Sequence, residues 1–87
     1  RFTEAIADYN RVLEINPNDA MAYNNRGNAS AGLGNWEDAI ADYQKATEIA
    51  PNFAFARANY ALALYQTGQN QEAIRTLKNI ARKYSMF

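Results

Sequence analysis

The feature that most constrains this chain is an internal repeat with a period of 34 residues. Ala5, Ala39 and Ala73 lie at successive multiples of this period, and each is followed directly by Ile. Pro17 and Pro51 are separated by the same distance. A fixed period of this length is typical of proteins that stack copies of one supersecondary unit. The sequence therefore predicts a stacked-repeat fold, in which each unit buries its apolar face against its neighbours.

Within each unit, apolar residues recur at spacings of three and four, which predicts amphipathic helices. Gly, Pro, Asn and Asp cluster between these segments, where they favour turns. Helices joined by such short connectors must run antiparallel to their neighbours. We therefore expect an all-α protein with no strands and with five helices, at residues 2–16, 20–33, 36–49, 54–67 and 71–84.

Small residues, aromatic residues and turn formers occupy fixed places in the unit. They are Gly27, Gly34, Trp36, Ala39, Tyr43, Ala46 and Pro51, followed one period later by Ala61, Gly68 and Ala73. With this pattern the whole chain resembles the tetratricopeptide repeat (TPR) family, as about two and a half repeats of a longer array. The resemblance implies a right-handed α-solenoid of helical hairpins. It divides the chain into the second helix of a partial repeat (1–19), a complete repeat (20–53) and a complete or terminal repeat (54–87).

Three positions depart from the family pattern. Arg26 stands where Leu is usual, Ser30 where Tyr is usual, and Ser85 where the third Pro is expected. The first two departures are expected to reshape the interior of one hairpin. The third affects how the last repeat ends.

Composition excludes several classes of chemistry. The chain has no Cys and no His, which removes disulfides, thiolate nucleophiles, histidine acid–base catalysis and the commonest zinc sites. The acidic residues show neither a catalytic arrangement nor the spacing of a calcium loop. We expect a protein that is not an enzyme and that uses no cofactor or metal.

The formal net charge is zero, but it is unevenly distributed. Residues 1–53 carry four basic and eight acidic side chains, whereas residues 54–87 carry five basic side chains and one acidic. The basic last helix lacks the long cationic stripe that tracks phosphates, so we expect no nucleic-acid partner. No apolar run approaches the roughly 20 residues of a membrane span. We expect a soluble, intracellular protein.

In TPR arrays, the first helix of each repeat lines a concave face that usually binds an extended peptide. Asn25 and Asn59, one period apart, are expected to form a short amide ladder that either meets a peptide backbone or only ties neighbouring repeats together. The apolar members of the set either contact a partly apolar peptide or pack between repeats. The resemblance thus implies a partner-binding set of Asn24, Asn25, Asn28, Phe55, Asn59, Leu62, Tyr65 and Gln66.

One TPR subclass holds the terminal carboxylate of a chaperone tail with lysines, an arginine and asparagines. Asn25 and Asn28 match two of those positions. However, Asn24, Phe55 and Asn59 stand where the cations of that subclass would be. Because a carboxylate is held best by charged donors, we expect no carboxylate clamp in this chain.

Two functions therefore follow from the sequence. The first is a non-enzymatic scaffold that binds a protein or peptide segment in the concave groove. The alternative is a structural element that stacks end to end or forms a swapped dimer, because the acidic first helix and the basic last helix would leave apolar surface uncovered.

Overall fold

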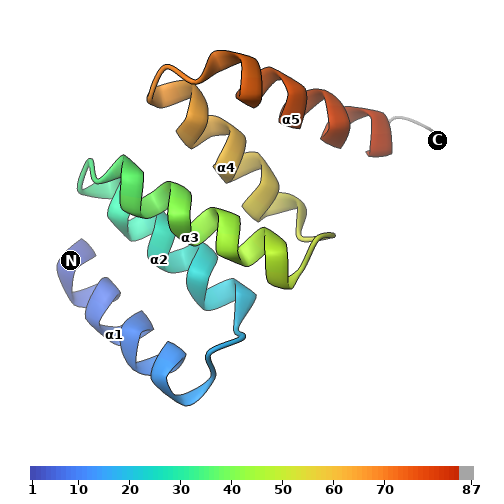
Figure 1. Cartoon of the computed structure of the whole chain (residues 1–87). Coiled ribbons are helices and arrows are strands. Elements are labelled where there is room, and N and C mark those ends of the chain that lie inside the picture. Colours follow the sequence, from blue (N-terminus) through green and yellow to red (C-terminus); the bar gives the residue numbers. More distant parts are fainter. Residues whose placement is uncertain (85–87) are drawn as a thin grey trace.

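The computed structural model describes the backbone of residues 1–84 and, among these, every side chain except those of Asn70, Glu72, Ala73 and Tyr84. Over this range the chain is all-helical, as predicted, and the helix ends differ from the expected ones by at most one residue. The helices stack in chain order and measure 38 × 26 × 17 Å together (Figure 1). They are α1 (Phe2–Ile15), α2 (Ala20–Gly32), α3 (Trp36–Ile49), α4 (Ala54–Gln66) and α5 (Asn70–Tyr84).

Glycine ends α2 and α4 in the same way. Gly34 and Gly68 have φ angles of 81° and 84°, a left-handed conformation that side chains with a Cβ disfavour. The N–H of Gly34 donates to the carbonyl of Ala31, and the N–H of Asn35 donates to the carbonyl of Ser30. This pair of bonds is the Schellman motif. Each predicted turn glycine thus reverses the chain within a repeat.

A side chain from the loop between α1 and α2 caps the start of α2. Asp19 precedes α2, and its Oδ1 accepts a hydrogen bond of 3.1 Å from the backbone N–H of Ala22. An N-cap of this kind satisfies one of the free N–H groups at a helix start. Asp19 is therefore the N-cap of α2.

The core between α2 and α3 depends on small residues. Ala39 and Tyr43 of α3 are buried together with Ala63 of α4. A Cβ added to Gly27 of α2 would lie only 2.8 Å from the Cε1 atom of Tyr43. The glycine is required because the ring of Tyr43 rests on the backbone of α2. Helices α2 and α3 therefore approach each other closely at Gly27.

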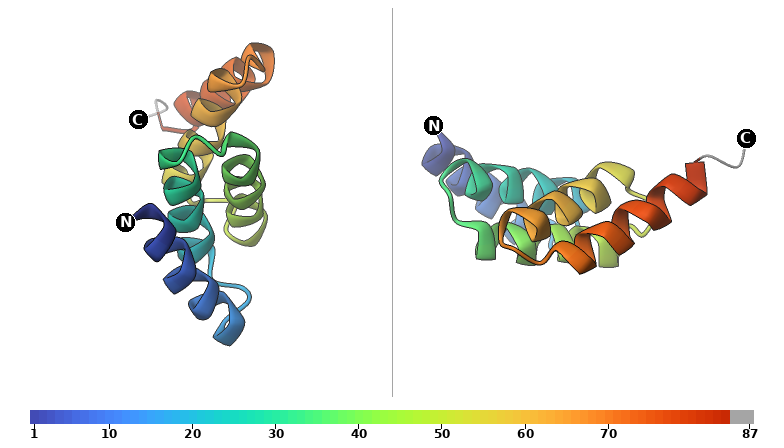
Figure 2. Two further views of the ribbon diagram at one scale, coloured as in Figure 1. Left: turned by 90° about the vertical axis from the view of Figure 1, so that its left-hand side faces the viewer. Right: turned by 90° about the horizontal axis from the view of Figure 1, so that it is seen from above.

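The stack is curved because the helices are closer on one side than on the other. Helices α2 and α4 contact each other, whereas α1 and α3 do not, nor do α3 and α5 within the described part of the chain. The inner face therefore belongs to α2 and α4. Helices α1 and α5 lie at opposite ends of the array (Figure 2).

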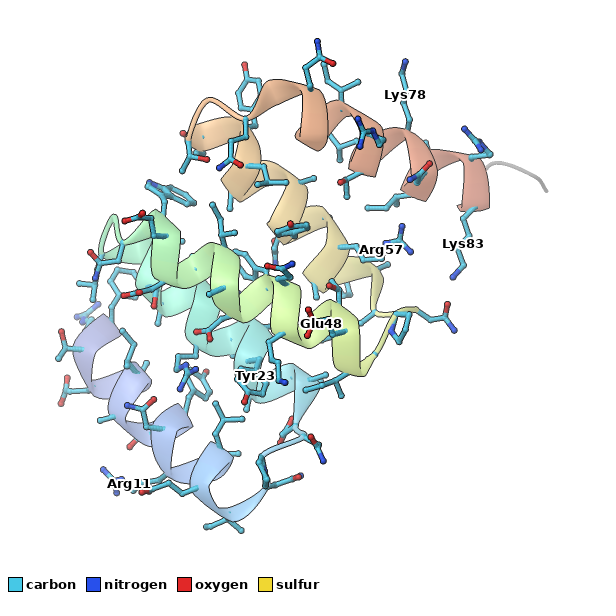
Figure 3. The ribbon with its side chains drawn as sticks, in the orientation of Figure 1. Arg11, Tyr23, Glu48, Arg57, Lys78 and Lys83 are labelled. Carbon is cyan, nitrogen blue, oxygen red and sulfur yellow. The ribbon has the colours of Figure 1, made fainter. Side chains whose placement is uncertain are left out.

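A charged side chain bridges the gap between α1 and α3. From α2, Arg26 donates two hydrogen bonds of 2.9 and 2.8 Å to the carboxylate of Asp42, and a third of 2.8 Å to Oδ1 of Asn10. Its guanidinium also lies 5.4 Å from the ring centre of Tyr23, which faces α1 in Figure 3. The hydrogen bonds that Arg26 donates to Asp42 raise the pKa of Arg26 above its ordinary value. A two-pronged ion pair thus replaces the apolar contact of the usual Leu.

The two end helices, α1 and α5, bury their apolar side chains less completely than the helical periodicity of the sequence suggests. Ile74 and Leu77 of α5 follow the helical spacing of a buried face, but each remains about half exposed. Val12 of α1 is also exposed. Lys78 points away from the array, while Lys83 turns back and donates to Oδ1 of Asn52 in the loop after α3 (Figure 3). The expectations for the side chain of Ala73 and for Ser85 lie outside the described residues.

Replacing Gly27 with Ala tests the close approach of α2 and α3. Ala favours helix by about 1 kcal/mol over Gly, but here the added methyl group collides with Tyr43. We expect Gly27→Ala to lower the free energy of unfolding by about 1–3 kcal/mol, measured by urea denaturation. In a Tyr43→Leu background, the same change should lower the free energy of unfolding by a smaller amount. A Gly27→Ala protein more stable than wild type would show that the two helices are not in contact there.

Candidate binding groove

The concave face carries large apolar side chains that the fold leaves uncovered. Phe55 of α4 is 77% exposed, and Met21 of α2 is 61% exposed. Leu62 and Tyr65 follow further along α4, and each is also more than half exposed. Gln66, the last residue of α4, is exposed as well. Burial of such a side chain stabilises a complex by roughly 1.5–3 kcal/mol, so this face is suited to contact with another chain.

Between α2 and α4 the face is hollowed. The hollow has a volume of about 300 Å³ and is open to solvent. It combines apolar and amide side chains, and none of the residues that line it is charged. The lining residues are Met21, Asn24, Asn25, Asn28, Phe53, Phe55 and Asn59.

The amide pair that links the two repeats differs from the expected one. Asn59 Nδ2 donates a hydrogen bond of 3.0 Å to Oδ1 of Asn24, not to Asn25. Asn24 is 5% exposed, so little of its side chain is accessible to a partner. The bond joins α2 to α4 at the floor of the hollow. Asn25 is only half-buried and lines the same hollow.

Asn28 is held in place from the core. The hydroxyl of Tyr43 donates a hydrogen bond of 2.6 Å to Oδ1 of Asn28. Because an amide group is planar, this bond directs the Nδ2 donor of Asn28 away from the core. Burial raises the pKa of Tyr43, and the nearby Asp42 carboxylate raises it further, so the hydroxyl stays protonated and able to donate.

Of the predicted set, four residues line the hollow and remain accessible: Asn25, Asn28, Phe55 and Asn59. Leu62, Tyr65 and Gln66 are exposed on α4 but do not line it. The predicted set omitted Phe53, which immediately precedes α4. The helical periodicity of the sequence places Phe53 in a loop. It therefore does not indicate that the ring of Phe53 faces the groove.

Two kinds of feature are missing from the described residues. Among them, no three His, Cys, Asp or Glu residues gather as metal ligands would. Within the same part of the chain, no helix is both long enough and apolar enough to cross a membrane.

The hairpin stack and its concave groove define a class of helical repeat protein, and family models identify the class. Models described as tetratricopeptide repeat match residues 20–53 and 42–75, and a TPR repeat model matches residues 1–34. Together these matches extend from residue 1 to residue 75. The chain belongs to the tetratricopeptide repeat family, as its sequence pattern predicted. No match was found among curated proteins.

Solved structures show the same architecture. The TPR2B domain of yeast Sti1, in a complex with pHsp70, is 34% identical and superimposes with a TM-score of 0.90 over 94% of this chain. Two structures of MamA are 28% identical, with TM-scores of 0.91 and 0.87 over 97% of this chain. The chain spans 66% of the Sti1 domain and 49% and 46% of the MamA chains, less than two thirds of each. These similarities show that the chain shares the helical-hairpin architecture of these structures.

The raised pKa of Tyr43 predicts how stability depends on pH. The hydroxyl holds its proton more tightly in the folded chain than in the unfolded chain, where its pKa is about 10. The contribution of this hydroxyl to the free energy of unfolding is therefore fully present below about pH 10. It is lost as the pH rises through the folded-state pKa. We expect the free energy of unfolding to fall above about pH 10, and Tyr43→Phe to make this fall shallower. Equal slopes for the two proteins, measured by denaturation between about pH 8 and 11, would rule out this role for Tyr43.

Proposed function

We propose that the chain is a non-enzymatic scaffold that binds an extended, uncharged and partly apolar peptide segment along the concave faces of α2 and α4. One observation carries this proposal: Phe55 is 77% exposed at the edge of a hollow that also contains amide groups. An extended peptide presents the same mixture, because its backbone alternates donors and acceptors while its side chains can be apolar. Asn25 and Asn28 supply amides of that kind.

The absence of charge in the hollow distinguishes the proposed ligand from an acidic tail. None of its lining residues is cationic, and Phe55 and Asn59 occupy positions where the carboxylate-binding subclass has cations. A terminal carboxylate placed there would lose water without gaining a charged partner, which is unfavourable. The proposed ligand is therefore an internal segment of a partner protein. The pHsp70 complex of the Sti1 domain supports a protein ligand in general but not one with the same chemistry.

Peptides selected from a random phage-displayed library, with this chain as bait, test the proposal. We expect selected peptides to be rich in aromatic and aliphatic residues. Phe55→Ala and Tyr65→Ala should each weaken binding about tenfold, since aromatic anchors dominate such interfaces. The matched control is Ile15→Ala, because Ile15 is 86% exposed but lies on α1, outside the groove. Fluorescence anisotropy measures the affinities.

Two further measurements separate this ligand from an acidic tail. Affinity should change little between about 0.05 and 0.5 M salt, because charge contributes little. Amidation of the peptide's C-terminus should also leave the affinity unchanged. The proposal fails if the Phe55→Ala and Ile15→Ala proteins bind alike, or if amidation removes binding. Asn25→Ala, which leaves the Asn59–Asn24 bond in place, then measures the contribution of the amide alone.

We propose self-association as a second candidate function, and exposed apolar residues beside opposite charges favour it. Ile15 of α1 is 86% exposed, and Ile74 and Leu77 of α5 are each about half exposed. Helix α1 carries three acidic residues and one basic, whereas α5 carries four basic residues and one acidic. These ends are complementary, so a second copy can pair its α1 with α5 of the first.

Sedimentation velocity across protein and salt concentrations measures this association. We expect the sedimentation coefficient to rise with protein concentration at low salt and to rise less at about 0.5 M salt. Leu77→Glu should reduce the association. Leu62→Glu, the same change in the groove, should not. A protein that stays monomeric at high concentration and low salt would eliminate this function.

A further inference from the structure

A second hollow lies on the side of the array away from the groove. Its volume is about 350 Å³, and it occupies the gap between α1 and α3. Arg26 and Ser30, two residues that depart from the family pattern, form its wall on α2. Ser30 lies about 200° around the helix axis from Asn28, so the two hollows are on opposite faces of α2. This second hollow results from residues particular to this chain, and it is separate from the peptide groove.

The ion pair between Arg26 and Asp42 forms an electrically neutral wall, and its hydrogen-bonding groups already have partners. Both carboxylate oxygens of Asp42 accept from Arg26, and Asn10 accepts a third bond from the same guanidinium. Arg26 and Asp42 therefore cancel each other's charge and leave little capacity for an anion. What the hollow can bind is decided by its other side chains.

Ser30 provides the strongest indication of a ligand. The residue is 4% exposed, and its hydroxyl has no hydrogen-bond partner among the described residues. In the same part of the chain, no polar side-chain atom is sealed from solvent without a partner. The hydroxyl of Ser30 must therefore open into the hollow that it lines. A buried hydroxyl with unused hydrogen-bonding capacity favours a polar ligand at that point.

Two further acceptors line the same hollow at the start of α3. Asp38 has no ion-pair partner among the described side chains, and its charge contributes to the raised pKa of Arg26. Asn35 precedes α3, but its side chain does not cap the helix. The carboxylate, the amide and the hydroxyl of Ser30 are three unused acceptors. With Arg26 and Asp42 cancelling, Asp38 gives the hollow a net negative charge.

We propose that this hollow binds the side chain of a lysine from a partner protein. An ammonium group has three N–H donors and no acceptor, which matches the three acceptors of Ser30, Asn35 and Asp38. The methylene stem of a lysine needs an apolar wall, and Ile6 and Ala41 line the hollow beside these acceptors. The site is independent of the peptide groove, so a partner can occupy both faces of α2.

Titration with N-acetyl-lysine N-methylamide, followed by ¹H–¹⁵N correlation spectra, tests the site. We expect saturable shifts at the amides of Ser30, Asn35 and Asp38, with a dissociation constant on the order of millimolar for one side chain. The norleucine counterpart has the same stem without the ammonium and should give no saturable shift. Absence of saturation with the lysine compound, or equal binding of the norleucine compound, would overturn the proposal.

Two variants sharpen the test. Asp38→Asn should raise the dissociation constant about tenfold, because the bond to the ammonium loses its charge assistance. Glu37→Gln makes the same charge change one residue away, outside the hollow, and should leave binding unchanged. Ser30→Tyr restores the residue usual in the family and should fill the hollow and abolish binding. Equal effects of Asp38→Asn and Glu37→Gln would contradict the proposal. The peptide affinity of the Asp38→Asn protein should be that of the wild type.

Discussion

The structure depends on the contact between the ring of Tyr43 and the backbone of Gly27. The ring is buried against α2 at a distance that leaves no room for a Cβ on Gly27. The same side chain joins the small-residue core of Ala39 and Ala63. Its hydroxyl then emerges at the concave face and holds Asn28. One residue therefore fixes the spacing within the hairpin and orients a group in the groove, so packing and recognition are physically coupled.

Curvature follows from where small and large side chains are placed. On the inner side, α2 and α4 come close enough for Asn24 and Asn59 to bond directly. On the outer side, α1 and α3 are separated, and Arg26 spans the gap with a partly buried ion pair. Such a pair contributes little net stability relative to an apolar contact, because removing charges from water is costly. The array therefore has a polar hollow on its back and an uncharged groove of apolar and amide side chains on its front.

The helices, their turns and the need for a small residue at Gly27 could be predicted from the sequence, because each follows from local periodicity. The interactions between repeats could not. Whether Asn24 or Asn25 meets Asn59 depends on a rotation of about 100° around the helix, which a period of 34 residues does not determine. The bond between Arg26 and Asp42 joins side chains 16 positions apart, and in the sequence only their opposite charges indicate that they could pair. Ile74 and Leu77 follow the helical pattern of a buried face, but among the described residues only α4 packs against α5.

Paramagnetic relaxation locates a bound peptide most directly. A library-selected peptide carrying a spin label at its centre is added to the ¹⁵N-labelled chain, and amide line broadening is measured residue by residue. We expect broadening to be strongest at Asn25, Asn28, Asn59 and Leu62, on the concave faces of α2 and α4, and weak along α3. Broadening centred on α3 or α5, with the concave amides unaffected, would contradict it.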